Sequence, residues 1–275
     1  MRAARIRIAA MLLAVLTGAC GTSAWPEPGH GPSTIALSER QRYVADELVS
    51  LFEHGGPEPQ YGAVEELADG RGLTCGTIGF TTSSTEVREI VEVYDAAAPG
   101  SRLARHLPRL RELADAGSDD TGGLPGFAED WRAAAGDPAF RAEQDRLTDR
   151  LAFDPALEHA HRLGLRTPLG VAVLFDSAVQ HGTADDPDGL PALIARATQR
   201  AGGTPAAGVA EPAWLVAFLD VRADTLRNPH DRDTRDAWSE SVDRVSALRD
   251  LVNRAAYDLA APLAVTLDGD EYDLR

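Results

Sequence analysis

Two neighbouring stretches decide the fold of this chain: Glu47-Leu-Val-Ser-Leu-Phe-Glu53, and Asp69-Gly-Arg-Gly-Leu-Thr-Cys-Gly-Thr-Ile-Gly-Phe80. The apolar spacing of the first is that of the end of an amphipathic helix. The second is a glycine-punctuated turn that runs into residues of β-type composition. Together they predict a helix that stops at Gly55, and a short strand that follows a tight turn.

Each stretch carries a carboxylate, and the two settings favour opposite protonation states. Glu53 falls in the last helical turn, where the partial negative charge of the helix end disfavours an anion. Asp69 precedes Arg71 and glycine N–H donors, so it should stay ionised. Two carboxylates with opposite preferences are typical of an acid/base pair. The local sequence also allows a surface glutamate and an aspartate that only caps its turn.

Length and charge limit the function classes. The 275 residues suffice for one large domain or for two lobes that share a cleft. The net charge of −16 argues against nucleic-acid binding, which needs a basic surface. An acidic surface can steer a cationic ligand towards the protein, or it can simply aid solubility.

The N-terminal segment, residues 1–20, is predicted to be a signal peptide. Three arginines precede an apolar run too short to span a bilayer. Leu16-Thr-Gly-Ala-Cys20 is similar to a lipoprotein cleavage box, with Cys20 as the lipidated residue. Plain secretion with cleavage near Ala24 is the alternative. We therefore expect a secreted protein, attached to a membrane at most through this lipid.

The rest of the chain divides into a predicted flexible tether, residues 21–37, and a folded domain, residues 38–275. Removal of the signal peptide leaves 24 basic and 43 acidic side chains, a net charge of −19. With Cys20 lipidated or removed, Cys75 has no partner for a disulfide. We interpret Cys75 as a small strand or core residue.

Helical patterns dominate the folded domain. A capping box at Ser38 opens the first helix, and Pro108 predicts a kink within a helix near residue 107. Further helices are expected at about 190–201, 211–227 and 233–259. The glycine-rich segment 117–125 could be a hinge between lobes or a mobile rim. The predicted class is mostly α, with one small strand region near the candidate site.

One predicted helix, residues 169–180, is apolar nearly all round and therefore buried. Asp176 lies in its middle, and a buried carboxylate must be paired. Arg222 and Arg235 are the candidate partners, and an ordinary buried salt bridge is the simplest interpretation of such a group.

Other kinds of site find little support. No pair of histidines has the spacing of metal ligands, and no G-x-S-x-G nucleophile motif or phosphate-binding loop occurs. Residues 185–189 lack the terminal glutamate of a calcium loop. We therefore expect neither a metal nor an organic cofactor, and the carboxylate pair remains as the candidate site.

The E-L-V-S-x-x-E string at 47–53 and the D-G-R-G-x-T-x-G-x-x-G-F string at 69–80 resemble the chitosanases of glycoside hydrolase family 46. The similarity extends over roughly residues 39–260. It implies a mostly α, lysozyme-like, two-lobed fold with a small β region beside the active-site cleft. It also implies endo-hydrolysis of β-1,4-linked glucosamine polymers with inversion, with chitosan as the partner of a monomeric enzyme.

By position, the resemblance makes Glu53 the general acid, Asp69 the general base and Thr74 a holder of the attacking water. Glu86 falls where the family often has an aspartate that binds a glucosamine amine. The remaining assignments are substrate contacts for Arg71 and Asp231, and a supporting network of Asp176, Arg222 and Arg235. Departures from the family, such as Pro57-Glu-Pro59 in place of a tryptophan segment, affect the substrate subsites.

Two alternatives to a chitosanase stay open. The first is a muramidase that acts on the bacterial wall, although a neutral sugar would need aromatic platforms and the chain has only four tryptophans and five tyrosines. The second is a non-catalytic surface lipoprotein that captures amino-sugar oligomers.

Overall fold

The computed structural model describes residues 34–67, 69–230 and 235–275. The predicted signal peptide, with Cys20, and most of the predicted tether lie outside this range. The described chain divides into two compact units, one formed by residues 53–150 and the other by residues 34–52 and 151–275. The predicted mostly α class is confirmed. None of the described helices is long and apolar enough to cross a membrane.

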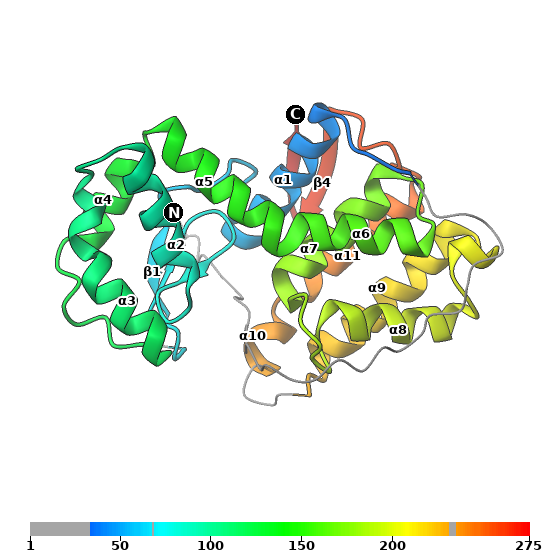
Figure 1. Ribbon diagram of the computed structural model, residues 1–275. Coiled ribbons are helices and arrows are strands. Elements are labelled where there is room, and N and C mark those ends of the chain that lie inside the picture. Colours follow the sequence, from blue (N-terminus) through cyan, green and yellow to red (C-terminus); the bar gives the residue numbers. More distant parts are fainter. Residues whose placement is uncertain (1–33, 68, 231–234) are drawn as a thin grey trace. The chain divides into compact units, whose positions relative to one another are not determined.

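The first unit holds a small antiparallel sheet and four α-helices (Figure 1). The sheet has the order β1-β2-β3, with Glu66 opposite Leu73 and Thr74 opposite Thr81. The elements of the first unit are β1 (Val64–Glu66), β2 (Leu73–Cys75), β3 (Phe80–Thr81), α2 (Glu86–Ala97), the 3-10 helix η1 (Arg102–His106), α3 (Leu107–Ala116), α4 (Phe127–Ala134) and α5 (Pro138–Thr148). This sheet is the strand region expected from the sequence.

The core of the first unit is aromatic. Trp131 of α4 and Phe140 of α5 meet edge to face with ring centroids 4.8 Å apart. Tyr94 of α2 packs on Phe140 in the same way at 5.1 Å. Edge-to-face pairs stabilise a core beyond the area that they bury, so these three helices form a firm support for the sheet.

The second unit is built around α7, which is buried from Leu169 to His181. It packs against α6, α8 and α11. The elements of the second unit are α1 (Glu39–His54, whose last two residues belong to the first unit), the end of a π-helical turn η2 (Asp149–Phe153), α6 (Asp154–Leu163), α7 (Pro168–His181), α8 (Leu190–Ala201), η3 (Pro205–Ala207), α9 (Glu211–Arg227), α10 (Arg235–Ser239), α11 (Val242–Asn253), β4 (Leu263–Leu267) and β5 (Asp270–Leu274).

Two predicted helix starts are confirmed by their hydrogen bonds. At α1, the Ser38 N–H donates to Gln41 Oε1 (3.0 Å), and the Gln41 N–H donates to Ser38 Oγ (3.3 Å). At α7, the Gly170 N–H donates to Thr167 Oγ1 (3.1 Å), and a proline occupies the first turn. Each cap satisfies a backbone donor that the helix itself leaves without a partner.

Two expectations about helices are corrected. Pro108 lies in the first turn of α3, where no backbone N–H is needed, so it starts a helix instead of kinking one. The helix expected over 233–259 is two helices, α10 and α11, and the second ends at Asn253. At the end of the segment predicted as a tether, His161 Nε2 lies 2.7 Å from the carbonyl oxygen of Ile35.

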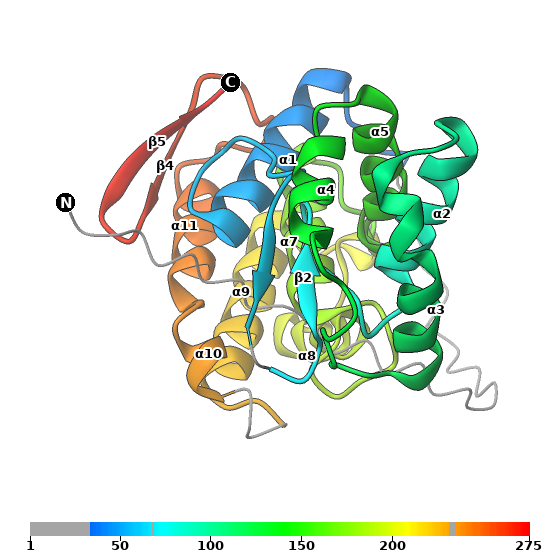
Figure 2. The ribbon, with the colours of Figure 1, turned by 90° about the vertical axis from the view of Figure 1, so that its left-hand side faces the viewer.

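A C-terminal hairpin, β4–β5, was missed by the sequence analysis. It packs beside α11 (Figure 2, red). Its turn, Asp268-Gly269, has positive φ at both residues (53° and 89°). Positive φ at both central residues is the requirement of a two-residue hairpin turn, and Asp-Gly is one of its strongest sequence signals. The backbone N–H of Arg275 then donates to Glu47 Oε2 of α1 (2.6 Å).

Candidate active site

Glu53 is the penultimate residue of α1 and is only 2% exposed. The helix end is fixed in the first unit because His54 Nε2 lies 2.8 Å from the carbonyl oxygen of Thr77, in the β2–β3 connection. Gly55 then adopts a φ of +72° and ends the helix. The structure therefore holds a buried glutamate at a rigid helix end attached to the small sheet.

Asp69 belongs to the connection between β1 and β2, in the same unit. Its Oδ1 accepts the Arg71 backbone N–H (3.1 Å), and its Oδ2 accepts the Arg71 guanidinium through Nε (3.0 Å) and Nη2. The side chain of Asp69 keeps 30% of its surface exposed. These hydrogen bonds fix the orientation of the carboxyl group, and its exposed surface leaves it accessible to water. Arg71, assigned to substrate binding, is thus engaged by the candidate base.

Thr74, the central residue of β2, is fully buried, and its Oγ1 has no hydrogen-bond partner among the described residues. A buried hydroxyl without a partner is costly, and such groups are rare in native structures. The strand register sets Thr74 beside Thr81. This hydroxyl can therefore bind a water or a substrate oxygen.

Glu86 is the first residue of α2, and its carboxylate turns back towards the sheet. Its Oε2 accepts the backbone N–H of Thr81 at 3.1 Å. Burial raises the pKa of Glu86, against the opposing effect of hydrogen bonds from Thr81 and Ser84 and of the charges of Arg71 and Arg150. The Glu86 N–H donates in turn to Ser84 Oγ (3.2 Å), just ahead of the helix.

Within the second unit, Asp176 lies at the centre of a buried charge cluster. It is 1% exposed, and its two oxygens accept Arg222 Nη1 at 2.5 Å and Arg244 Nη2 at 2.9 Å. The predicted pairing with Arg222 is therefore confirmed. The second partner is corrected: it is Arg244 of α11, whereas Arg235 is exposed at the start of α10. The Arg244 guanidinium also lies 5.3 Å from the ring of Phe52, which directly precedes Glu53.

Helical periodicity could have identified Arg244. It precedes Leu248 by four residues and Leu251 by seven, and both leucines are buried. Residues with this spacing share one face of a helix, so Arg244 must point into the core of the second unit. A buried guanidinium requires an acidic partner, and Asp176 provides one.

His181 completes the same cluster. Its Nε2 lies 3.3 Å from Arg222 Nε, and its Nδ1 lies 3.0 Å from the carbonyl oxygen of Asp188. Burial, followed by the charges of Arg222 and Arg244, lowers the pKa of His181 well below its ordinary value. A neutral ring with its proton on Nδ1 satisfies both contacts, because Nε2 then accepts from Arg222.

Two assigned residues, Asp231 and Cys20, lie outside the described residues. Cys75 is a buried free thiol of β2, as expected, and burial raises its pKa. The first unit thus contains Glu53, Asp69, Thr74 and Glu86, and the second contains Asp176 and its arginines.

Residues 47–263 match the sequence model of glycosyl hydrolase family 46. A chitosanase of Bacillus subtilis (strain 168) is 48% identical over 229 residues, which make up 83% of this chain and 83% of that protein.

Solved structures show the same relationship. A mutant chitosanase from Bacillus subtilis MY002, complexed with 6 GlcN, is 46% identical with a TM-score of 0.82, covering 87% of this chain and 100% of that one. A family 46 chitosanase of Gynuella sunshinyii, in complex with chitotetraose, is 42% identical with a TM-score of 0.81, covering 87% of this chain and 99% of that one.

Proposed function

This chain belongs to glycosyl hydrolase family 46, and on that basis we propose that it hydrolyses β-1,4 bonds between glucosamine units inside chitosan chains, with inversion. The relatives named as chitosanases support the substrate. The observation that carries the proposal is that one unit contains a buried helix-end glutamate, an arginine-bonded aspartate and a buried Thr74 hydroxyl with no hydrogen-bond partner among the described residues.

The two carboxyl groups divide the proton transfers between them. Protonated Glu53 donates its proton to the glycosidic oxygen as the bond to the anomeric carbon breaks. Ionised Asp69 removes a proton from a water, whose oxygen attacks that carbon from the opposite face. The products are a new hemiacetal and a free hydroxyl, and the configuration is inverted. Inverting enzymes need a carboxyl separation of roughly 6.5–9.5 Å to admit this water.

Thr74 and Arg71 prepare the base side of the reaction. The Thr74 hydroxyl accepts a hydrogen bond from the attacking water or donates one to it, and so fixes the direction of the water's attack. Arg71 orients Asp69 through its backbone and guanidinium hydrogen bonds. Orientation of this kind can lower a barrier by several kcal/mol, because the reacting groups no longer search for their geometry.

Isosteric amides test the acid and the base. Glu53→Gln and Asp69→Asn should each lower the turnover of chitosan by about 10²- to 10⁴-fold, with binding of a glucosamine hexamer retained. Reducing-end release and calorimetry measure the two properties. Glu92→Gln, which neutralises a surface glutamate paired with Arg111 in the same unit, is the matched control and should be as active as the wild type.

Product analysis separates this function from its alternatives. Proton NMR during hydrolysis should show the α-anomer first, as inversion requires, and initial β-anomer would contradict the mechanism. Parallel assays with peptidoglycan should release no reducing ends. A Glu53→Gln variant that turns over chitosan at the wild-type rate would show that Glu53 is not the acid.

We also propose that the protein is exported and acylated at Cys20. The support is the basic and apolar N-terminal sequence with its cleavage box. Mass spectrometry of the mature protein from its native host should find a diacylglycerol-modified Cys20. An unmodified N-terminus near residue 25 would indicate simple secretion instead.

A further inference from the structure

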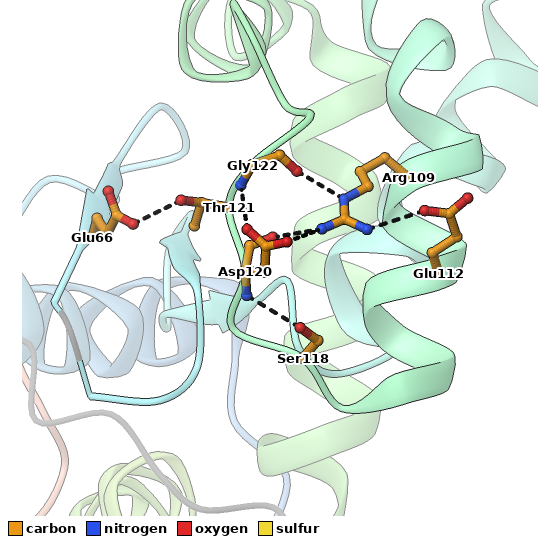
Figure 3. A network of polar contacts seen from close by, with 7 residues as sticks. All are labelled: Glu66, Arg109, Glu112, Ser118, Asp120, Thr121 and Gly122. Carbon is orange, nitrogen blue, oxygen red and sulfur yellow. Dashed lines mark hydrogen bonds and ion pairs between the residues drawn. The ribbon is translucent and has the colours of Figure 1, made fainter.

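The segment 117–125, expected to be a hinge or a mobile rim, is fixed within the first unit between α3 and α4. Arg109 of α3 donates to the carbonyl oxygen of Gly122 through Nε (2.8 Å) and to Asp120 Oδ2 through Nη2 (2.7 Å) (Figure 3). The Gly122 N–H donates to Asp120 Oδ1 (2.9 Å). We call residues 117–125 the clamped loop. Arg109 binds both the backbone of this loop, at Gly122, and its acidic side chain, Asp120.

The clamped loop touches both ends of the connection that carries Asp69. At one end, Thr121 Oγ1 donates to Glu66 Oε1 of β1 at 2.8 Å (Figure 3). At the other end, a Cβ placed on Gly72 would lie 3.5 Å from the carbonyl oxygen of Asp119. In the β1–β2 register, Glu66 faces Leu73, the residue that follows Gly72. The loop therefore meets the connection at its base, at the last residue of β1 and at the residue before β2.

This support is needed because the sheet is small. β1 and β2 have three residues each and β3 has two, and so short a sheet does not define the position of a turn by itself. Catalytic groups must be held within about 0.5 Å of their productive position. A loop anchored on α3 supplies a rigid reference for the base.

We propose that the clamped loop positions Asp69, with Thr121 and Arg109 as positioning residues of the hydrolysis. The inference rests on the proposed role of Asp69 as the base. The contacts are exposed side-chain hydrogen bonds and ion pairs, which add little to folding stability. Their loss should therefore displace the turn, and so slow the reaction, without unfolding the unit.

The test compares Thr121→Val with Thr121→Ser. Valine keeps the shape of threonine but removes the donor to Glu66, whereas serine keeps the hydroxyl. Thr121→Val should lower kcat on a glucosamine hexamer by about tenfold with an unchanged KM, since misplacement of a reacting group by 1 Å costs up to ~10²-fold. Thr121→Ser should restore the rate, and Arg109→Gln should lower kcat at least as far as Thr121→Val does.

Arg111→Gln is the matched control. It removes another exposed ion pair of α3, with Glu92, and leaves the clamped loop intact. A second readout is hydrogen exchange of the Arg71 amide, which donates to Asp69 Oδ1. Exchange should accelerate in Thr121→Val and stay unchanged in Arg111→Gln.

Asp69→Asn, measured in parallel, separates the two proposals. If Asp69→Asn remains active, the proposed base is wrong. If Asp69→Asn is inactive while Thr121→Val and Arg109→Gln match the wild type in kcat and in Arg71 exchange, the positioning role is wrong. A loss of activity that follows the melting temperature, and that serine does not restore, would likewise overturn the positioning role.

Discussion

At the scale of single residues, the hydroxyl group of Thr74 is the most informative feature of the site. It is buried in β2 and has no partner among the described residues. Folding has thus removed a polar group from water without an internal hydrogen bond, at a cost of about 1–3 kcal/mol. Such a cost is explained when the group serves the bound state of the enzyme.

Thr74→Val tests this explanation by replacing the hydroxyl with a methyl group of similar size. We expect the free energy of unfolding to stay equal or to rise by about 1 kcal/mol, because no internal bond is lost. Turnover of chitosan should fall at least tenfold, since the water loses its holder. Thermal unfolding and reducing-end assays measure the two effects. Full activity of Thr74→Val would refute the role of the hydroxyl, and Thr74→Ser is the control.

The sequence determines some of these residues and not others. An all-apolar helix with one aspartate predicts a buried, paired Asp176, and that prediction needs no structure. The choice between Arg235 and Arg244 depends on where α10 ends and α11 begins, and the helical pattern over 233–259 does not show that break. The roles of Glu53 and Asp69 came from the family resemblance, because their local chemistry also fits surface residues.

At the scale of elements, α7 shows how one helix sets the protonation of a cluster. It contributes Asp176, Gln180 and His181, and Arg222 contacts all three. A protonated His181 would place a third positive charge beside the charges of Arg222 and Arg244, which already lower its pKa. The neutral ring is therefore part of the folded state of this element.

This lowered pKa gives a pH dependence of stability with a definite sign. Between the lowered folded pKa of His181 and its ordinary value near 6.5, only the unfolded chain binds the proton. The contribution of neutral His181 is thus complete above about pH 6.5 and is lost as the pH falls towards the folded pKa. Glu47 and Glu86, whose pKa burial raises, have the opposite slope.

A comparison of the wild type with His181→Gln isolates the histidine. The stability difference between the two proteins should shrink as the pH falls from 7 to 4, because glutamine does not titrate. Melting temperatures across that range measure this difference. A constant difference would mean that His181 does not resist protonation in the folded state.

The β4–β5 hairpin shows what an element-scale reading of the sequence can miss. Its first strand, β4, alternates in burial, and Asp268-Gly269 has the composition of a hairpin turn. These signals are local and were present in the sequence. The clamped loop is different: Gly117 to Pro125 is rich in glycine and polar residues, which predict mobility, and only the contacts of Arg109 and Thr121 show that it is held.

At the scale of the whole molecule, charge sets the encounter with the substrate. The chain carries a net charge of −16, and −19 without the predicted signal peptide. Glucosamine polymers are cationic when their amines are protonated. An acidic enzyme attracts such a polymer before any specific contact forms, so part of the binding free energy should be screened by salt.

Salt titration of an inactive variant measures the part of the binding free energy that salt screens. The affinity of Glu53→Gln for a glucosamine hexamer should fall by about tenfold or more between 0.01 and 0.5 M NaCl, because the screening length drops from about 30 Å to less than 10 Å. The fully N-acetylated hexamer has the same length and no charge, so its weaker binding should change little. Calorimetry at pH 5.5 measures both ligands. If salt affects the two oligomers equally, the acidic surface serves solubility and plays no part in recognition.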